Sequence, residues 1–415
     1  MPLRGNLMVG QSGGPTAVIN ASLAGVIEEA KRHSEVGDLY GAVGGVEGML
    51  REEMVDLRAE GDGVTSLLSR TPSAALGSCR KKLVESEYER LLAVLKAHNV
   101  RYLCYIGGND SADTCHQIGR LAEEAGWEMR VVGIPKTVDN DLAYTDHCPG
   151  YGSVARFNAM AVRDAGLDTA ALHRVDTVKI VETMGRNAGW ITAATALARE
   201  APGDPPHFIY LPERPFDRER FLSDVKQQVE KGRGCVVAVC EGIRDVDGNV
   251  LVSFRHEVGT DSFGHKQLGG VGDYLVGLIA EGLGIKGRFD KAGTIQRVFG
   301  LAQSEVDVAE AKMVGAAAVQ RACEGVTDMM VTLERVSQEP YRCETGLAPL
   351  ADVANAERPM PDEYIAPEGN DVTPAFIEYV RPLIGGPLPA YARLRMRRVA
   401  KRVEGQHQQP RSNCD

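Results

Sequence analysis

A lysine and two aspartates stand within six residues of one another, directly after an apolar stretch of the chain. The stretch reads MRVVGIPKTVDNDL, in which these polar residues are Lys136, Asp139 and Asp141. A carboxylate held at the end of a buried strand can act as a general base, and a lysine beside it can neutralise developing phosphate charge. A plain turn is the alternative, because Asp and Asn side chains bond to nearby backbone groups and favour turns.

Two glycine pairs stand where an apolar stretch meets a helical pattern. Gly13 and Gly14 lie in GQSGGPTAVIN, where bare backbone N–H groups at a helix N-terminus can cradle an anion, although a tight turn explains them equally well. The second pair, in YIGGNDSADT, is followed by Asn109, Asp110 and Ser111, whose usual role would be a helix cap. Neither segment matches a Walker loop or the G-x-G-x-x-G dinucleotide fingerprint.

Three further segments bring charge to the ends of apolar stretches. Arg186 follows a glycine in VETMGRN and suits a bound anion or hydroxyl. Glu241 has the same place in CEGIR, where a buried structural carboxylate is an equal alternative. KGRFDKAGTIQR holds four cations in twelve residues, which are more often a solvated surface unless they converge on a phosphate: Lys286, Arg288, Lys291 and Arg297.

The elements that must position these residues repeat one pattern, a short apolar strand, a glycine-containing loop and an amphipathic helix. The strands show no alternation of polar and apolar residues, which indicates burial on both faces and hence parallel sheets covered by helices. Ligands of such sheets bind at the carboxyl ends of the strands, where every charged motif lies. We expect strands at 6–11, 101–106, 129–135, 176–182, 206–212 and 235–243, and helices at 16–33, 111–127, 188–201 and 216–234.

Length and composition exclude several classes of protein. The 415 residues, 43% hydrophobic and 25% charged, suffice for two or three globular domains. A formal net charge of -10 argues against a general affinity for nucleic acid. We expect no signal peptide and no membrane span, since no apolar run reaches about 18 residues. Nine cysteines without a C-x-x-C pair indicate neither a disulfide framework nor a zinc site, and fit a reducing cytoplasm.

The pattern weakens after about residue 340. Residues 348–374 are rich in proline and acid and are predicted to wrap a domain irregularly. A last helix is expected at 389–403, with six Arg or Lys between Arg393 and Arg402. A solvated helix face explains that run, and a partner or anion site is the alternative. The tail at 404–415 is expected to be disordered.

Six motifs occur together in one order: QSGGPTAVIN, GGNDS, PKTVDND, VETMGR, CEG and GTIQR. In this order and spacing the chain resembles the phosphofructokinases from about Asn6 to about Asp328, and YRCETGLAPLADVANAERPMPDEYI is similar to their pyrophosphate-using branch. The resemblance implies two Rossmann-like three-layer α/β domains with parallel-rich sheets and an active site in the cleft between them. It also implies a donor domain at 1–150, a sugar-phosphate domain at 151–340, between which segments can cross, and an extension at 341–415.

The resemblance assigns roles to individual residues. Asp139 would take the proton from the sugar hydroxyl, with Thr137 beside the moving phosphoryl group. Asp141 would support the metal and phosphate end of the site. The remaining contacts fall into three groups: Gly13, Gly14, Arg80 and Ser111 for the donor, Met184, Gly185, Arg186 and Glu241 for the sugar, and Arg288 and Arg297 for its 6-phosphate.

The donor is indicated by two departures from the ATP-using pattern, GGDGS and PGTIDND. Asp110 and Lys136 replace glycines that leave room for the α-phosphate of ATP. Asp110 would exclude that phosphate by volume and like charge, while Lys136 would stabilise the transferring and leaving phosphates. Pyrophosphate is therefore the expected donor and Mg²⁺ the expected cofactor. Asp110 is the first candidate for the metal carboxylate, with Asn109 and Asp141 beside it.

The resemblance implies reversible phosphoryl transfer from pyrophosphate to the 1-hydroxyl of fructose 6-phosphate, a step of glycolysis and gluconeogenesis. An ATP-dependent phosphofructokinase is the nearest alternative, and a non-catalytic sugar-phosphate-binding subunit is an alternative of another class. The missing fingerprint disfavours a dehydrogenase. Thr294 replaces a histidine of the ATP-using members, and no arginine near Thr177 matches the one that a neighbouring subunit lends. A cytoplasmic homo-oligomer, dimer or tetramer, is expected.

Overall fold

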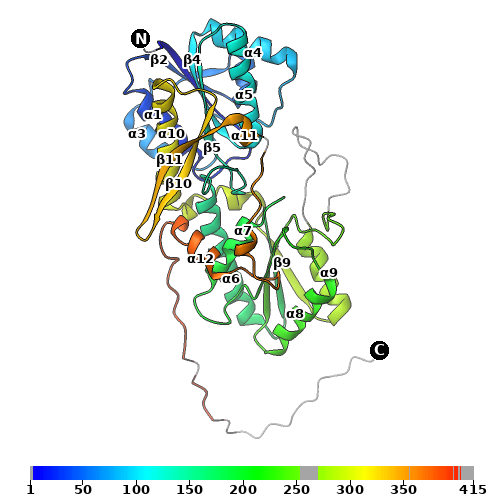
Figure 1. The fold of residues 1–415 in the computed structure, drawn as a ribbon. Coiled ribbons are helices and arrows are strands. Elements are labelled where there is room, and N and C mark those ends of the chain that lie inside the picture. Colours follow the sequence, from blue (N-terminus) through cyan, green and yellow to red (C-terminus); the bar gives the residue numbers. More distant parts are fainter. Residues whose placement is uncertain (1–2, 253–269, 355, 396, 401, 403–415) are drawn as a thin grey trace.

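The structure is a computed structural model that describes residues 3–252, 270–354, 356–395, 397–400 and 402. These residues form two α/β domains, each built around its own sheet (Figure 1). None of the helices within the described residues is long and apolar enough to cross a membrane.

The first sheet has seven strands, of which the five central ones run parallel and the two edge strands antiparallel. Apolar side chains on both faces of the central strands hold helices on either side, which makes three layers. In spatial order the strands are β11 (Tyr341–Pro349), β10 (Met329–Gln338), β5 (Arg130–Pro135), β4 (Val100–Gly107), β1 (Gly5–Gln11), β2 (Val36–Ala42) and β3 (Met54–Asp56). The helices are α1 (Ile19–Ala30), α3 (Asp62–Leu68) and α10 (Glu305–Cys323) on one face, and α2 (Gly45–Arg51), α4 (Glu85–Ala97), α5 (Asn109–Glu124) and α11 (Leu350–Ala354) on the other.

The second sheet has four parallel strands and is likewise covered on both faces. Its two central strands, β8 and β6, are buried at every residue, which explains why their sequences show no alternation. In spatial order the strands are β7 (Phe208–Tyr210), β8 (Cys235–Cys240), β6 (Val178–Thr183) and β9 (Gly287–Lys291). The helices are α6 (Tyr151–Leu172), α7 (Trp190–Ala194) and α12 (Pro374–Val380) on one face, and α8 (Arg218–Glu230) and α9 (Val271–Leu283) on the other.

Short 3₁₀ helices complete the described elements, and one of them, η2, contains the GTIQR motif. They are η1 (Thr195–Ala198), η2 (Gly293–Arg297), η3 (Gly300–Ala302), η4 (Asp362–Tyr364) and η5 (Pro382–Ile384).

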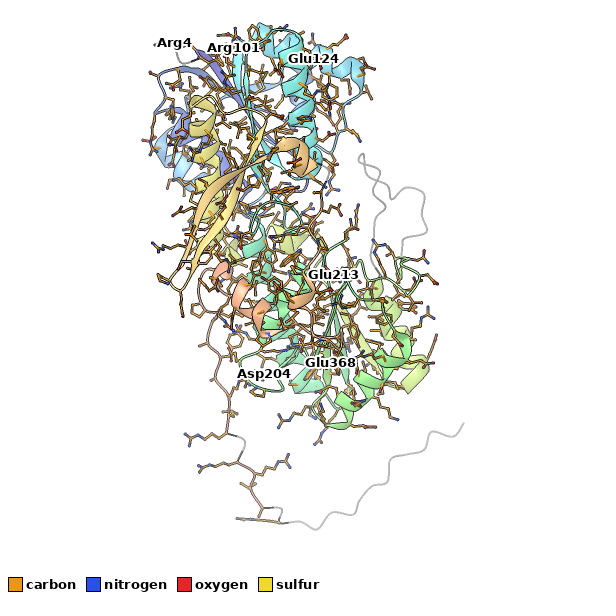
Figure 2. All side chains as sticks on the ribbon, in the orientation of Figure 1. Arg4, Arg101, Glu124, Asp204, Glu213 and Glu368 are labelled. Atoms are coloured by element: carbon orange, nitrogen blue, oxygen red, sulfur yellow. The ribbon has the colours of Figure 1, made fainter. Side chains whose placement is uncertain are left out.

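The carboxyl ends of the parallel strands in each sheet face the other domain. Figure 2 shows Arg101, at the start of β4, at the end of the first domain that lies farthest from the second. In the second domain Glu213 follows β7 and lies toward the first domain, while Asp204 precedes β7 and lies at the far side. Since ligands of parallel sheets bind at the carboxyl ends, the region between the domains is where a site is expected.

The α/β class and the parallel-rich sheets are confirmed, but the predicted limit at residue 340 does not separate two units. After the second sheet the chain returns to the first domain, where Met329 of β10 pairs with Val132 of β5. β11 then pairs antiparallel with β10, so the predicted extension 341–415 begins as an edge strand of the first sheet. These two strands were not predicted from the sequence, because many of their residues are exposed and polar and interrupt the continuous apolar run that marked the other strands.

The six predicted strands and four predicted helices are all present; the strands at 6–11 and 101–106 are longer than predicted, and the four helices are shorter. The greatest shortening is in the region 188–201, where α7 ends at Ala194 and continues as a 3₁₀ turn. The long helix α6 and the helix α10 were not predicted, since both combine many small residues with a weak apolar stripe.

The predicted basic helix at 389–403 is wrong for the residues that the structure describes there, which form no helix. Leu394 and Val399 are 84% and 91% exposed, so a helix here would bury no apolar face. Instead the segment is held by side chains of the second domain, as where Arg393 pairs with Asp204. The predicted disordered tail at 404–415 lies outside the described residues.

Candidate active site

The loop that follows β5 forms a turn and carries the charged side chains of Lys136, Asp139 and Asp141. The backbone N–H of Lys136 donates to the carbonyl oxygen of Gly107 at 3.0 Å, which ties the loop to the end of β4. Asn140 has a positive φ of 57°, and its buried side chain accepts from the N–H of Cys148 and donates to the hydroxyl of Tyr379. The predicted turn is therefore present, and asparagine, which tolerates this conformation, fixes it.

A cavity of about 230 Å³ lies at the carboxyl ends of strands from both sheets. It gathers every predicted site residue except Arg288 and Arg297, and adds Gly108, Asn187 and Glu357. The predicted residues that line it are Gly13, Gly14, Arg80, Asn109, Asp110, Ser111, Lys136, Thr137, Asp139, Asp141, Met184, Gly185, Arg186 and Glu241.

Three cations converge on the glycine pair that follows β1. A Cβ atom placed on Gly13 would lie 3.0 Å from Nζ of Lys136. A Cβ atom on Gly14 would lie 2.9 Å from Nη1 of Arg297 and 3.5 Å from Nη2 of Arg80. Glycine thus leaves open the space into which these cations reach, and Gly13 also has a positive φ of 74°.

The charge of this cluster fits a bound polyanion. Burial, together with repulsion by Arg297 and Arg80, lowers the pKa of Lys136 to about 8. Burial and then the charge of Arg80 lower the pKa of Arg297, whose buried Nε has no hydrogen-bond partner among the described residues. An anion between the three groups would relieve their repulsion and accept hydrogen bonds from them, so a phosphate suits this place.

Two partly buried carboxylates follow the lysine on the same loop. Burial and then the charge of Glu241 raise the pKa of Asp139 above its ordinary value. Burial and then the charge of Asp139 raise the pKa of Asp141. The backbone N–H of Asp139 donates to Oγ1 of Thr137 at 3.1 Å, which helps to fix the loop. A carboxylate whose pKa is raised in this way is a stronger general base.

The oxygen donors of the cavity fit a divalent cation. Oδ1 of Asp139 is buried and has no hydrogen-bond partner among the described residues. Asp110 and Asn109 stand in the first turn of α5, where Oδ1 of Asn109 accepts from the N–H of Asp110 at 2.9 Å. Carboxylate, amide and phosphate oxygens are the ligands that Mg²⁺ prefers, so this group of residues is suited to that ion.

Residues from the second sheet form the remaining wall. Gly185 has a φ of 138°, and a Cβ atom there would lie 2.7 Å from the carbonyl oxygen of Ala188 and from Sγ of Cys240. The N–H of Met184 donates to Oε1 of Gln296 at 3.2 Å, so the GTIQR motif supports this turn from beneath. The glycine therefore lets the backbone turn sharply and present Met184 and Arg186 to the cavity.

Glu241 enters the cavity at the end of β8. Nζ of Lys291 lies 3.5 Å from Oε2 of Glu241 and 2.7 Å from Oε1 of the buried Glu182. Burial raises the pKa of Glu241, and the lysine charge opposes this shift. Lys291 is thus a member of the basic run that reaches the site indirectly, by holding a carboxylate that lines it.

Arg288 does not line this cavity. β9 pairs with β6 so that Arg288 stands beside Lys179, near the amino end of β6, whereas the cavity lies beyond its carboxyl end. Its Nε donates to Oδ2 of Asp176 at 2.5 Å, within a second hollow of about 530 Å³. The prediction that groups Arg288 with Arg297 does not match the arrangement within this chain, because most of β9 separates the two arginines.

The C-terminal segment adds residues that the sequence did not single out. Glu357 lines the cavity and accepts from Nδ2 of Asn187 at 3.1 Å. The guanidinium of the next residue, Arg358, lies 4.8 Å from the ring centre of Trp190 and donates to the carbonyl oxygen of Asn140 at 2.8 Å. The same guanidinium also donates to the carbonyl oxygens of Thr145 and Asp146. The acidic, proline-rich composition of this segment does not predict that Arg358 would hydrogen-bond to the loop of the two aspartates.

Known proteins resemble this chain over almost its whole length. Residues 6–322 match the family described as Phosphofructokinase. A Halomonas elongata protein named pyrophosphate--fructose 6-phosphate 1-phosphotransferase is 43% identical over 96% of this chain and 98% of its own length. A Xanthomonas campestris protein of the same name is 44% identical, with the same shares of the two chains covered.

Solved structures extend the likeness to the fold. The crystal structure of a pyrophosphate-dependent phosphofructokinase from Marinobacter aquaeolei matches with a TM-score of 0.83 at 40% identity, over 96% of this chain and 98% of that chain. A pyrophosphate-dependent phosphofructokinase from Nitrosospira multiformis gives 0.84 at 41% identity, over 97% and 99%. With its motifs gathered in one cavity between two such domains, the chain belongs to the phosphofructokinase family.

Proposed function

We propose that this chain is a pyrophosphate-dependent phosphofructokinase. It transfers a phosphoryl group reversibly from pyrophosphate to the 1-hydroxyl of fructose 6-phosphate, and forms fructose 1,6-bisphosphate and phosphate. The observation that carries the proposal is the donor end of the cavity, where Lys136 is buried beside the Gly13–Gly14 pair and Asp110 lines the same space. The names of the relatives that match almost the whole chain point to the same donor and acceptor.

The donor binds at the cationic cluster. Backbone N–H groups of the glycine pair and the side chains of Arg80, Lys136 and Arg297 surround its phosphates. Arg297, which the resemblance assigned to the 6-phosphate of the sugar, lies with its Nη1 beside Gly14 and thus within reach of the donor. We therefore place its charge near the transferring phosphoryl group, where the negative charge of the transition state is spread over the phosphate oxygens.

Asp139 acts as the general base. It removes the proton from the 1-hydroxyl while the sugar oxygen forms its bond to phosphorus and the bridging bond of pyrophosphate breaks. The electron pair of that bond leaves with the departing phosphate, whose charge Lys136 and Arg80 stabilise. Burial and the charge of Glu241 raise the pKa of Asp139, which increases its affinity for the proton. In the reverse reaction the protonated Asp139 returns the proton to the sugar oxygen.

Mg²⁺ is the cofactor that suits the oxygen donors. Asp110, Asn109 and Asp141 would hold it, and it would neutralise part of the charge of the phosphates. The carboxylate of Asp110 has a second consequence, since it occupies the place where a longer donor would put a further phosphate. Exclusion of ATP therefore follows from volume and from like charge.

The two alternatives are less well supported. An ATP-dependent enzyme is not favoured, because the relatives that match most of the chain are named for pyrophosphate. A non-catalytic subunit would have no need of a base, yet Asp139 lines the cavity together with Arg186 and with Lys136, which is buried.

A coupled assay with each donor in turn tests the proposal. The purified chain is incubated with fructose 6-phosphate, Mg²⁺ and either pyrophosphate or ATP, and fructose 1,6-bisphosphate is measured. We expect turnover with pyrophosphate, its loss after chelation of Mg²⁺, and formation of fructose 6-phosphate in the reverse direction. Turnover with ATP and none with pyrophosphate would overturn the donor assignment, and binding of the sugar phosphate without transfer would favour the non-catalytic alternative.

Two broader expectations also stay proposals. The chain is proposed to act as a homo-oligomer of two or four copies, which sedimentation or size-exclusion chromatography measures directly. It is proposed to work in the cytoplasm, which agrees with the free thiols of all eight cysteines that the structure describes.

A further inference from the structure

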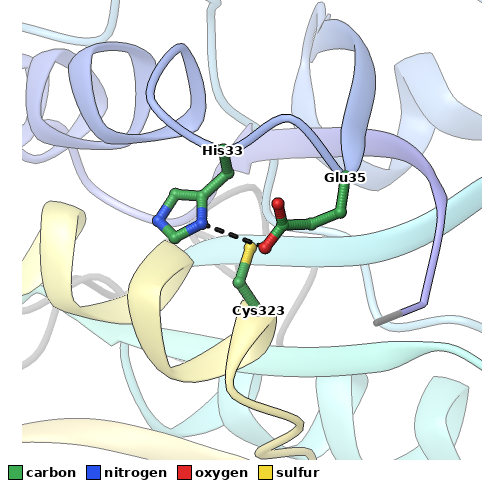
Figure 3. A group of neighbouring side chains, drawn as sticks. All are labelled: His33, Glu35 and Cys323. Carbon is green, nitrogen blue, oxygen red and sulfur yellow. Dashed lines mark hydrogen bonds and ion pairs between the residues drawn. The ribbon is translucent and has the colours of Figure 1, made fainter. Parts of the chain in front are cut away.

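Three potential metal ligands meet in the first domain (Figure 3). His33 and Glu35 lie in the turn between α1 and β2, and Cys323 is the last residue of α10. A ring nitrogen of His33, a carboxylate oxygen of Glu35 and Sγ of Cys323 all lie within 4.8 Å of one another. Glu35 directly precedes β2, so the group stands at the amino ends of the strands, opposite the edge that carries the catalytic residues.

A fourth residue prepares the histidine for this role. Nε2 of His33 lies 3.2 Å from Oε1 of Glu29, while Nδ1 lies 3.2 Å from Oε1 of Glu35. Histidines that bind a metal usually donate the N–H of their other ring nitrogen to a carboxylate, which fixes the tautomer and the orientation of the ring. With Nε2 protonated and held by Glu29, the lone pair of Nδ1 points toward Glu35 and Cys323.

We propose that His33, Glu35 and Cys323 bind a Zn²⁺ ion or a similar divalent transition metal. Imidazole nitrogen, thiolate sulfur and carboxylate oxygen form a donor set that Zn²⁺ accepts and that Mg²⁺ does not favour. Neighbouring ligand atoms of a tetrahedral zinc site lie roughly 3.3–3.8 Å apart, as bond lengths of about 2.0–2.3 Å require. The separation of Nδ1 and Oε1 is already 3.2 Å, and the sulfur needs a shift of about one ångström or less.

The thiol of Cys323 is suited to a divalent cation as a ligand. It is partly buried, and it would coordinate as a thiolate, because a thiol that binds such an ion is deprotonated. His33 and Glu35 keep 22% and 18% of their side-chain surface exposed, which leaves water a path to the fourth position.

The ion would clamp the carboxyl ends of two packed helices. α1 and α10 approach so closely that a Cβ atom on Gly315 would lie 2.0 Å from the carbonyl oxygen of Ser22. α1 also starts shortly after the Gly13–Gly14 pair of the donor site. A ligand that binds the folded chain and not the unfolded chain raises the stability of the folded chain by mass action. We therefore expect the ion to stabilise the packing of the two helices, and turnover not to require it. The ligands are far apart in the sequence, which is why cysteine spacing alone indicated no zinc site.

Co²⁺ is the probe for the first test, because bonding to a thiolate gives it a charge-transfer absorption in the near ultraviolet. The full-length chain is stripped with a chelator and titrated with Co²⁺. We expect one equivalent to produce this absorption, Zn²⁺ to displace it, and Cys323→Ser to abolish it. No cysteine is among the described residues that line the catalytic cavity, so Co²⁺ bound there does not produce the signal.

Cys343→Ser is the matched control, since Cys343 is also partly buried and lies near a histidine and a glutamate. It should leave the absorption intact, whereas Glu29→Ala should weaken metal binding about tenfold to a hundredfold through the histidine. Unchanged pyrophosphate-dependent turnover of Cys323→Ser shows that this variant has folded. Absence of the absorption in the parent chain, or its survival in Cys323→Ser, overturns the proposal.

Zn²⁺ itself gives a second readout that is independent of cobalt. We expect it to raise the thermal unfolding midpoint of the parent chain and of Cys343→Ser, and to protect Cys323 from alkylation. An equal rise in Cys323→Ser, or alkylation of Cys323 at the same rate with and without Zn²⁺, counts against the site.

Discussion

The guanidinium of Arg297 lies against Gly14, so the loop that follows the first strand meets the 3₁₀ turn that follows β9. A Cβ atom on Gly14 would lie 2.9 Å from Nη1 of Arg297. One residue belongs to the first sheet domain and the other to the second, and 283 residues separate them in the sequence (297 − 14). The contact joins the two halves of the proposed donor site and leaves no room for a side chain at this glycine.

Gly14→Ala is expected to displace Arg297 and with it the charge that faces the donor. A misplacement of about 1 Å at a reacting group costs up to a hundredfold, so we expect kcat/KM for pyrophosphate to fall about tenfold to a hundredfold. The unfolding midpoint should change little, because the atom that must move is the end of a flexible side chain. Steady-state kinetics and thermal unfolding measure both. Gly277→Ala, on a helix where a Cβ atom meets nothing within 4 Å, is the control, and equal kinetics in the two variants would contradict this account.

Asp139→Asn is expected to remove the base and keep the shape of the site. General base catalysis contributes about 10²–10⁴-fold, so kcat should fall by about a thousandfold. Binding of fructose 6-phosphate, measured by calorimetry, should change by no more than a few-fold. Asp62→Asn, at a fully exposed aspartate, serves as the matched variant. A kcat near that of the parent chain would remove Asp139 from the role of base.

Asp110→Gly is expected to relax the exclusion of ATP. The substitution removes a carboxylate from the donor end of the cavity and restores the glycine of the ATP-using pattern. ATP-dependent turnover should become measurable, and turnover with pyrophosphate should fall because a candidate metal ligand is lost. Both donors are compared in the same coupled assay. If ATP is excluded as strictly as before, other residues select the donor.

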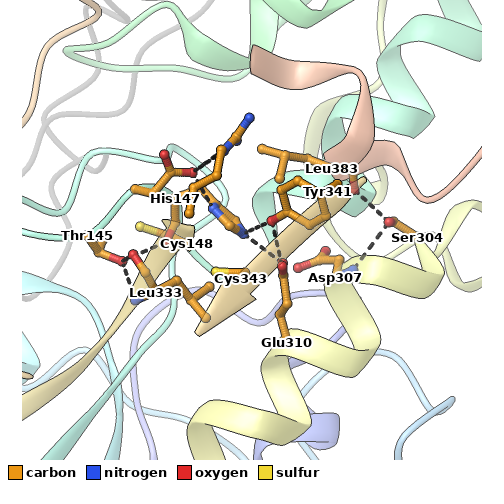
Figure 4. Close-up of polar contacts among 12 residues, drawn as sticks. Thr145, His147, Cys148, Ser304, Asp307, Glu310, Leu333, Tyr341, Cys343 and Leu383 are labelled. Carbon is orange, nitrogen blue, oxygen red and sulfur yellow. Dashed lines mark hydrogen bonds and ion pairs between the residues drawn. The ribbon is translucent and has the colours of Figure 1, made fainter. Parts of the chain in front are cut away.

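The polar contacts of the buried His147 (Figure 4) are expected to make the free energy of unfolding depend on pH. Nδ1 of His147 lies 2.7 Å from Oδ1 of Asp146, and Nε2 lies 2.7 Å from Oε2 of Glu310. The other carboxylate oxygen of Glu310, Oε1, accepts from the hydroxyl of Tyr341. Burial by itself lowers the pKa of His147, but the hydrogen bonds of the two carboxylates outweigh it and raise the pKa to about 9. The ordinary value in an unfolded chain is about 6.5.

Because the pKa of the folded state is the higher one, the stabilisation by His147 is complete below about pH 6.5 and is lost as the pH rises through about 9. His147→Gln should therefore lower the free energy of unfolding by about 3 kcal/mol at pH 6 and by much less above pH 9. Urea unfolding at several pH values measures this. The control is His98→Gln, whose imidazole is 30% exposed and pairs with Glu52. A loss of stability that does not vary with pH would mean that packing, and not charge, is what the histidine contributes.

Much of the catalytic half of the molecule could be predicted from local sequence. Strands such as β8 are apolar at every position because both faces are covered, and that pattern requires no knowledge of the partner strands. The loop with Asp139 follows such a strand directly, so the placement of its charges at a carboxyl end was predictable too. The same holds for Asp110, which stands in the first turn of a helix after a glycine pair.

Other features depended on contacts between distant segments, which local pattern does not contain. Arg288 and Arg297 belong to one basic run, yet β9 carries them to different ends of the second sheet. Arg358 donates a hydrogen bond to the carbonyl oxygen of Asn140, in the loop of the two aspartates, although the two residues lie 218 positions apart in the sequence. Neither outcome can be read from residue type or spacing.

The sequence by itself determined the α/β class, the resemblance to the phosphofructokinases and most of the residues that line the cavity, because each depends on strand and loop patterns a few residues long. Only the tertiary structure decided which cations surround the Gly13–Gly14 pair, where the C-terminal segment returns to the first sheet, and that His33, Glu35 and Cys323 meet. The physical reason is that packing of whole helices and strands sets these distances, and packing joins residues without regard to their separation along the chain.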